Sequence, residues 1–107
     1  MSGPGDLGER VTIEAPLRAS DGAGGAAISW SEVATVWADV ISFKGTELFN
    51  ADKLEAREPF RVVIRHRTDV TADMRLRWRG RVLDIRGAFD PDGRRRWLAI
   101  DCEERGS

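Results

Sequence analysis

Arginines are the side chains in this sequence with the greatest capacity to bind other molecules. Arginine accounts for fifteen of the seventeen basic residues. In the second half of the chain it recurs at alternating positions: Arg61, Arg65, Arg67, Arg75, Arg77, Arg79, Arg81 and Arg86. A guanidinium group is weakly hydrated and binds carboxylates and phosphates through paired hydrogen bonds. Placed on adjacent strands, mostly opposite the apolar positions, these residues predict a stripe that contacts other subunits or a DNA backbone without reading its sequence.

The charge balance weighs against a dedicated nucleic-acid binder, since the net charge is −1 and such domains are strongly basic. Residues 1–58 hold five basic and ten acidic side chains, whereas residues 59–107 hold twelve and eight. This asymmetry favours head-to-tail stacking on copies of the chain or on partners of opposite sign, unless the fold intermixes the two halves. A solvated outer face, with arginines paired to Asp and Glu of neighbouring strands, stays open as a third alternative.

The sequence holds no recognisable catalytic, cofactor or metal site. His66 is the only histidine and Cys102 the only cysteine, so neither has a companion at metal-ligand spacing. Asp90 and Asp92 flank a proline in a predicted turn, where Asp is the expected residue type. Glu103 and Glu104 are expected to be solvated near the C-terminus. We therefore predict a structural histidine, a buried apolar cysteine, no cofactor and no enzymatic activity.

The sequence also gives no sign of a membrane association. No apolar run approaches the roughly 18 residues that span a bilayer. Met1–Gly8 lacks the apolar region of a signal peptide, which predicts synthesis in the cytoplasm.

The first half of the chain predicts two strands. Residues 10–15 alternate apolar and polar side chains, and Pro16 is expected to end this strand. A glycine-rich loop over 20–27 leads to a long strand over 28–43, in which Val36, Ala38 and Val40 share a face. We expect Trp30 and Trp37 to anchor the core or its rim.

The period changes between the second and third strands. Leu48, Ala51 and Leu54 fall on one helical face, Thr46 suits an N-cap, and Pro59 ends the segment. Residues 43–58 therefore predict a long loop or short helix inserted between early strands. Connections of this length within a small β domain are uncommon and often functional.

The second half reads as further strands. Phe60–Arg67, Met74–Trp78 and Val82–Ile85 alternate, Gly80 suits a tight turn or bulge, and Asp90–Gly93 predicts a turn before a strand over 94–103. Leu98, Ile100 and Cys102 form the expected inward face of that strand. The pattern predicts a mainly β protein: a small antiparallel barrel or sandwich, one domain over 1–107 with flexible tails at 1–8 and 104–107.

The order of these features resembles the phage head–tail joining proteins, also called head completion or stopper proteins. The most specific parts are Val-Trp-Ala at 36–38 and the strand ending in Ile-Arg-His-Arg at 64–67. The resemblance runs from Leu7 to Glu103. It also includes the segments 8–13, 45–59, 78–85 and 97–103 and the Gly/Asp loop before Trp30.

The resemblance implies a virion component at the neck of a tailed phage or phage-like particle, made in the bacterial cytoplasm. It implies a ring of identical β-barrels, with a hexamer favoured over a dodecamer. The ring would sit between the head adaptor or portal ring and the tail terminator or tail tube, around double-stranded DNA. The arginine-, alanine- and glycine-rich composition would also suit a gene transfer agent.

The resemblance further implies that the inserted loop projects into the lumen and helps to retain or gate DNA. The residues at matching positions are Lys44, Gly45, Thr46, Glu47, Leu48, Phe49, Asn50 and Lys53. The alternative function is a small nucleic-acid-binding barrel that uses the arginine-rich sheet face.

Overall fold

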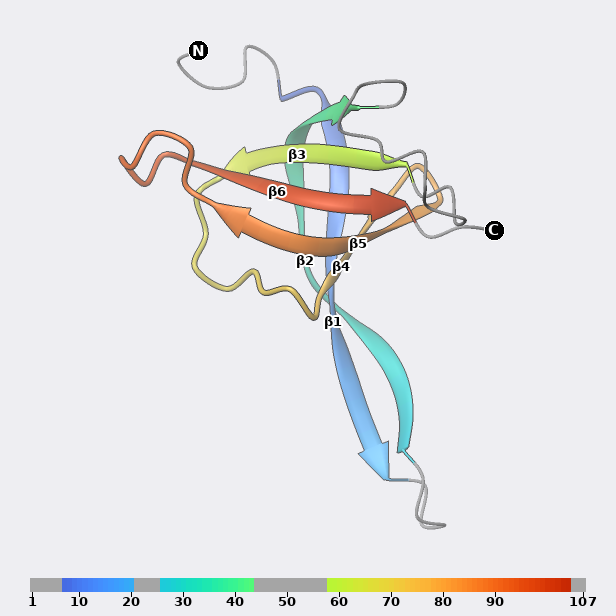
Figure 1. Cartoon of the computed structure of the whole chain (residues 1–107). Coiled ribbons are helices and arrows are strands. Elements are labelled where there is room, and N and C mark those ends of the chain that lie inside the picture. Colours follow the sequence, from blue (N-terminus) through green and yellow to red (C-terminus); the bar gives the residue numbers. More distant parts are fainter. Residues whose placement is uncertain (1–6, 21–25, 44–57, 105–107) are drawn as a thin grey trace, which may run out of the picture.

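The protein folds as six antiparallel strands joined into one closed barrel. The computed structural model describes residues 7–20, 26–43 and 58–104. The strands are β1 (Glu9–Ser20), β2 (Ala26–Ser42), β3 (Pro59–Arg65), β4 (Arg75–Trp78), β5 (Arg81–Phe89) and β6 (Trp97–Glu104). Their order around the barrel is β1-β2-β3-β6-β5-β4 (Figure 1). The predicted mainly β, antiparallel barrel is confirmed; the predicted inserted loop or helix lies, apart from Phe43 and Glu58, outside the described residues.

The core fills the inside of the barrel with one apolar side chain at nearly every second position. Ile13, Ile64, Leu76, Leu83 and Ile100 are completely buried and come from five different strands. Leu98, Ile100 and Cys102 face inward as predicted. This alternation is what a closed small barrel requires, because its interior is just wide enough for side chains to fill. Burial raises the pKa of the Cys102 thiol to about 12, so this cysteine stays protonated and unreactive.

The barrel closes through a short seam between β1 and β4. Only three pairs join these strands: Thr12 with Arg77, Ile13 with Leu76, and Glu14 with Arg75. Strands β4 and β5 are joined by a two-residue turn in which both Arg79 and Gly80 have positive φ, 53° and 77°. Two positive φ values are the geometry that matches the twist of a tight hairpin, which confirms the turn predicted at Gly80.

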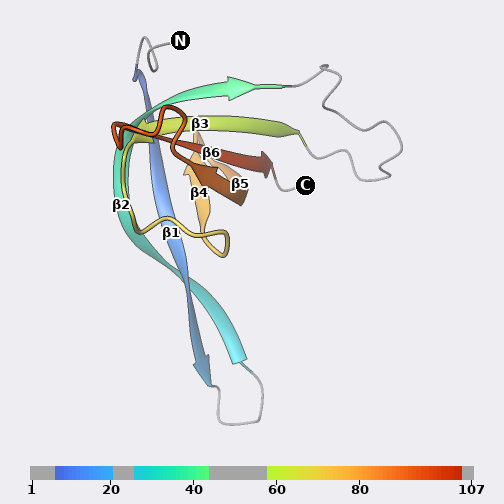
Figure 2. The same cartoon turned by 60° about the vertical axis from the view of Figure 1, so that its left-hand side comes forward.

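Strands β1 and β2 continue far beyond the barrel as a two-stranded arm (Figures 1 and 2). The prediction that Pro16 ends the first strand is wrong, because β1 runs on to Ser20 and Pro16 pairs with Trp30. Past Glu14, β1 has no neighbour except β2 among the described strands, and edge positions tolerate proline because one side of the strand makes no ladder hydrogen bonds. We define the arm as residues 15–20 and 26–33.

Three other local predictions need correction. Trp37 is 52% exposed on the outside of the barrel and does not belong to the core, whereas Trp30 is half-buried at the base of the arm. Glu103 and Glu104 are half-buried residues of β6, not solvated residues of a frayed end, and the predicted C-terminal tail therefore does not begin at 104. The strand predicted over Phe60–Arg67 ends at Arg65, so His66 follows β3 and does not lie within it. His66 is half-buried, and its backbone N–H donates to the Arg96 carbonyl.

The seam supplies the first prediction. Leu76→Ala removes a completely buried side chain from the centre of the shortest strand pairing. We expect the free energy of unfolding to fall by about 2–5 kcal/mol, because lost burial and a residual cavity add. Urea denaturation followed by tryptophan fluorescence measures it. Ala72→Ser, in an exposed turn, is the control and should change stability by less than about 0.5 kcal/mol; a similar loss in both variants would contradict the role of the seam.

Candidate functional site: the arginine-bearing outer surface

The predicted arginine stripe is divided between two separate walls of the barrel. Arg61 and Arg65 lie on β3, whereas Arg75 and Arg77 lie on β4. Strands β3 and β4 are not neighbours, since β6 and β5 separate them on one side and β2 and β1 on the other. The expectation of one stripe on adjacent strands is therefore wrong. These side chains do alternate with inward apolar ones, as expected.

Most of the predicted contact arginines already bind a carboxylate of the same chain. On the β3 side, Arg61 makes two hydrogen bonds to Asp101 (2.7 and 3.2 Å), and Arg67 makes two to Asp69 (2.9 and 2.8 Å). The Arg67 guanidinium lowers the pKa of Asp69 below its usual value. Paired in this way, both arginines have little charge left to offer a phosphate backbone.

The β4 arginines converge on one carboxylate at the seam. Arg75 Nε donates to Glu14 Oε1 at 2.7 Å and its guanidinium stacks 4.1 Å from the centroid of the Trp30 ring. Arg77 lies 3.7 Å from the other oxygen of Glu14. Glu14 is the only charged side chain that is buried in the described part of the chain. A buried carboxylate requires such partners, because leaving it unpaired is costly.

The β4–β5 turn completes this wall with three further ion pairs. Arg79 makes two hydrogen bonds to Glu9 (3.0 and 2.8 Å), and Glu9 also accepts the Trp78 indole N–H at 2.9 Å. Arg81 binds Glu104 at 2.9 and 2.5 Å and lies 3.4 Å from Glu58. The Trp78 indole, followed by Arg79, lowers the pKa of Glu9, and Arg81 lowers the pKa of Glu104.

Four arginines without such a partner among the described residues, Arg10, Arg65, Arg94 and Arg95, lie on another part of the outer face. A row crosses four strand positions there: Arg10 pairs with Trp37, and Arg65 pairs with Trp97. Trp37 and Arg65 are the next positions after the Ala38–Ile64 pair, so the row continues across β2 and β3. The guanidinium of Arg10 lies 4.8 Å from the Trp37 centroid, and that of Arg65 lies 5.4 Å from the Trp97 centroid. We call this set, Arg10–Trp37–Arg65–Trp97, the cation–aromatic row.

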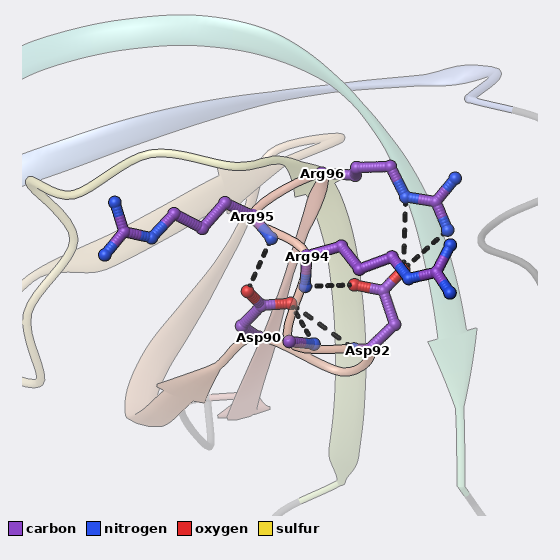
Figure 3. A network of polar contacts seen from close by, with 6 residues as sticks. Asp90, Asp92, Arg94, Arg95 and Arg96 are labelled. Carbon is purple, nitrogen blue, oxygen red and sulfur yellow. Dashed lines mark hydrogen bonds and ion pairs between the residues drawn. The ribbon is translucent and has the colours of Figure 1, made fainter.

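The β5–β6 turn carries two more guanidinium groups of this kind, those of Arg94 and Arg95 (Figure 3). Asp90 accepts the backbone N–H groups of Asp92, Gly93 and Arg95, and the left-handed φ of 57° at Arg95 is held by the 2.8 Å bond to Asp90. Asp92 accepts the Arg94 backbone N–H and binds the Arg96 guanidinium. The hydrogen bond from the Arg94 N–H, and then that from Arg96, lowers the pKa of Asp92. In the described part of the chain, the side chains of Arg94 and Arg95 meet no carboxylate. The hydrogen bonds of the turn therefore hold the backbone of Arg94 and Arg95, whose side chains are exposed.

Two shallow grooves lie on this side of the barrel. One has a volume of about 560 Å³ and is lined by Leu7, Val36, Trp37, Arg65, His66 and Arg67. The other has a volume of about 340 Å³, and we call it the β3–β6 groove. Its lining is Ile41, Phe43, Arg61, Val63, Phe89, Pro91, Asp92, Trp97 and Ala99. Both offer apolar contact area with arginine at the rim, the composition of protein contact hot spots.

No group of three or more His, Cys, Asp or Glu side chains that would hold a metal ion occurs among residues 7–20, 26–43 and 58–104. The same residues include no helix long and apolar enough to cross a membrane. The predicted loop residues Lys44, Gly45, Thr46, Glu47, Leu48, Phe49, Asn50 and Lys53 lie outside the described residues. The proposed roles of these residues, and the contact roles of the seven paired and unpaired arginines, stay predictions.

Fold and surface together define a class: a small closed β-barrel that offers a contact surface. Over residues 3–105 the chain matches the phage head completion protein family, and it belongs to that family. It is therefore a structural component of the phage head–tail region and a constituent of virion particles. Comparison with curated proteins gave no match.

Solved structures share the fold, and two of them are the following. The chain is 31% identical to protein SF1141 from Shigella flexneri 2a, known from a solution structure, covering 100% of this chain and 99% of that chain with a TM-score of 0.77. It is 24% identical to a chain in the virion of a native gene transfer agent particle, covering 97% of this chain and 100% of that chain with a TM-score of 0.73.

Sequence reasoning missed the surface residues that remain able to contact another molecule. Arg10, Trp37 and Trp97 were not singled out as contacts, and neither were Arg94 and Arg95. Cross-strand register brings the first three together, and nothing in the linear spacing of Arg10 and Trp97 indicates it. For Arg94 and Arg95 the signal was present, since three consecutive arginines follow an Asp-Pro-Asp-Gly turn.

The ion pairs predict a sign for the pH dependence of stability. The pKa of Glu104 is lower in the folded chain than its ordinary value of 4.5, so the stabilisation is fully present above that value. It is lost as the pH falls through the lowered pKa. We expect the free energy of unfolding to decline on acidification below about pH 4.5, and to decline less in Glu104→Gln. Urea midpoints at about pH 7 and pH 3 measure this; Glu32→Gln is the exposed control and should keep the wild-type decline, and an equal change in both variants would contradict the assignment.

Proposed function

We propose that the chain forms a ring at the neck of a tailed phage or gene transfer agent particle and joins the DNA-filled head to the tail. Each subunit is one domain over 1–107, and the ring is a hexamer, with a dodecamer as the alternative. One side of the ring binds the head adaptor or portal ring, and the other binds the tail terminator or tail tube. Family membership over residues 3–105 is the observation that carries this proposal.

The pairing of the arginines supports a role in enclosing DNA more than in gripping it. Six of the seven arginines predicted to contact subunits or DNA have a carboxylate partner within 4 Å in the same chain, and only Arg65 has none among the described residues. Non-specific DNA affinity depends on the number of phosphates that free cations neutralise. A ring of such subunits would surround double-stranded DNA without sequence preference while interacting with it weakly.

The segment between β2 and β3 is the part that we propose to retain or gate the DNA. Its two ends are held together, because the Phe43 backbone N–H donates to the Pro59 carbonyl at 3.0 Å and the Ser42 hydroxyl donates to Glu58 at 2.8 Å. The barrel therefore does not depend on the segment to bring β2 and β3 together. Residues 44–57 supply the side chains proposed to face the lumen.

Because the two ends of this segment are held together by residues outside it, a deletion can test the role of the segment without opening the barrel. We expect a chain lacking residues 46–56 to keep the barrel and its cooperative unfolding, while particles that carry it leak DNA or fail to join tails. Circular dichroism of the purified chain, nuclease sensitivity of packaged DNA and electron microscopy of particles measure the three outcomes. A matched variant with these residues replaced by a glycine–serine segment of equal length separates loss of length from loss of side chains. Tailed particles that retain their DNA after the deletion would refute the gating role.

A second function, a small nucleic-acid-binding barrel, has one observation in its favour. The cation–aromatic row alternates arginine and tryptophan across the sheet, and such surfaces stack bases and contact phosphates. That function predicts a monomer whose affinity for DNA falls steeply with salt. We expect weak DNA binding instead, and the double variant Arg65→Gln/Arg95→Gln to change it by less than about threefold. A titration at about 50 and 200 mM salt decides, and tight, strongly salt-dependent binding by the purified chain would favour the second function.

A further inference from the structure

The arm formed by β1 and β2 is the part of the structure that the barrel does not explain. Strand β2 pairs with β3 only from Ala38 to Ser42, and β1 pairs with β4 only from Thr12 to Glu14. Beyond these points the two strands have only each other as neighbours in the described structure (Figure 2). An isolated two-stranded ribbon is marginally stable in water and needs a further strand or a packing surface.

Both faces of the arm carry large apolar side chains in the open. Leu17 is 53% exposed and Ile28 is 54% exposed. Leu17 pairs with Ser29, whereas Ile28 lies one position along β2, so the two side chains project from opposite faces of the ribbon. At the base of the arm, Val33 is 37% exposed, next to the bulge that the register shift at Ile13/Glu14 records. Exposed apolar residues on both faces indicate that the arm is covered in the assembled state.

The β3–β6 groove is a receptor of matching chemistry on the same chain. Val63 and Ala99 form its floor: they are 5% and 2% exposed, yet they lie outside the core cluster, because they alternate with the inward residues of their strands. Phe89 at the rim is 43% exposed. The Trp97 indole N–H is buried and has no acceptor among the described residues. An incoming strand edge, with unpaired carbonyl groups, has the acceptors that such a donor lacks.

Charge supports a second copy as the occupant. Cations without a carboxylate partner in the described structure lie beside the groove: Arg65 stacks on Trp97, and Arg94 and Arg95 belong to the turn that carries Pro91 and Asp92. Glu32 at the base of the arm is exposed, and its partner among the described residues is the Thr35 hydroxyl. The arm leaves the barrel and leads away from β3 and β6, the strands that carry the groove (Figure 1). One copy therefore offers an arm and a groove that it cannot use on itself.

We propose that the arm of one subunit lies in the β3–β6 groove of the next subunit. The contact is heterologous, with a different surface on each partner, so it repeats around a closed ring and leaves no groove empty. The inference rests on the proposed ring and assigns its interface. Leu17, on one face of the arm, supplies the apolar contact, and Phe89 with Val63 receives it.

The first experiment locates the contact in assembled particles. Leu17→Cys combined with Phe89→Cys places one thiol on the arm and one at the groove, and the buried Cys102 gives a silent background. A short bis-maleimide should link subunits into a ladder that ends at the closed ring. Leu17→Cys combined with Ala72→Cys, in the exposed turn before β4, is the matched control and should give no ladder. Rings in which only the control pair cross-links would overturn the inference and leave the ring intact.

The second experiment uses complementary defects in the purified chain. Leu17→Asp/Ile28→Asp disables the arm, and Phe89→Asp disables the groove. Each should weaken self-association by about tenfold or more, since each loses the burial of a large apolar side chain. An equimolar mixture should give one-to-one dimers and nothing larger, because one intact arm meets one intact groove. Native mass spectrometry measures the masses. A mixture that stays monomeric, or a single variant that associates like the wild type, overturns the inference.

The two proposals fail in different ways. Rings at the particle neck with normal tails in the Leu17→Asp/Ile28→Asp variant would refute the arm contact and leave the proposed function standing. Cross-linked neighbours without a ring at the neck would support the contact and refute the function. Cross-linking of the arm to a protein of another ring would show that the groove is not its receptor.

Discussion

The structure depends on the seam at which β1 meets β4. Only three residue pairs close the barrel there, and they combine an apolar pair, Ile13 with Leu76, with the buried ion pair of Glu14 and Arg75. Without this pairing the sheet would present two open edges, which invite indiscriminate strand addition. The seam also ends at Glu14, so everything that β1 continues into must leave the barrel as an arm. The closure of the barrel and the projection of the arm are both consequences of the short β1–β4 pairing.

The same closure determines what the arginines do. Alternation sends every second side chain outward, and cross-strand pairing sets those side chains beside carboxylates of neighbouring strands. Glu9, Glu14, Asp101 and Glu104 then neutralise arginines that look free in the sequence. What remains available is set by register: Arg65 faces an aromatic ring, and Arg94 and Arg95 project from a turn whose carboxylates are occupied by backbone N–H groups.

The sequence was sufficient for the fold class, the inward residues of β6 and the turn at Gly80, because each follows from local period or backbone chemistry. It was not sufficient where strand order matters. Arg61 and Arg75 look equivalent along the chain, yet they belong to opposite walls of the barrel. Pro16 looked like a strand end because proline cannot donate to a ladder, and only the edge position of β1 removes that objection. Trp37 looked like a core residue because its exposure depends on which face closure turns inward.

The arm and the groove differ from the rest of the surface in the same respect. Over much of the remaining described surface, carboxylates meet guanidinium groups, and apolar side chains fill the barrel. The arm exposes Leu17 and Ile28, and the groove leaves the Trp97 indole without an acceptor among the described residues. Such departures carry a free-energy cost in the isolated chain, and a single contact between copies removes both. A subunit that is complete only beside its neighbour favours assembly over free existence, which is the physical requirement for a component that functions only as part of a particle.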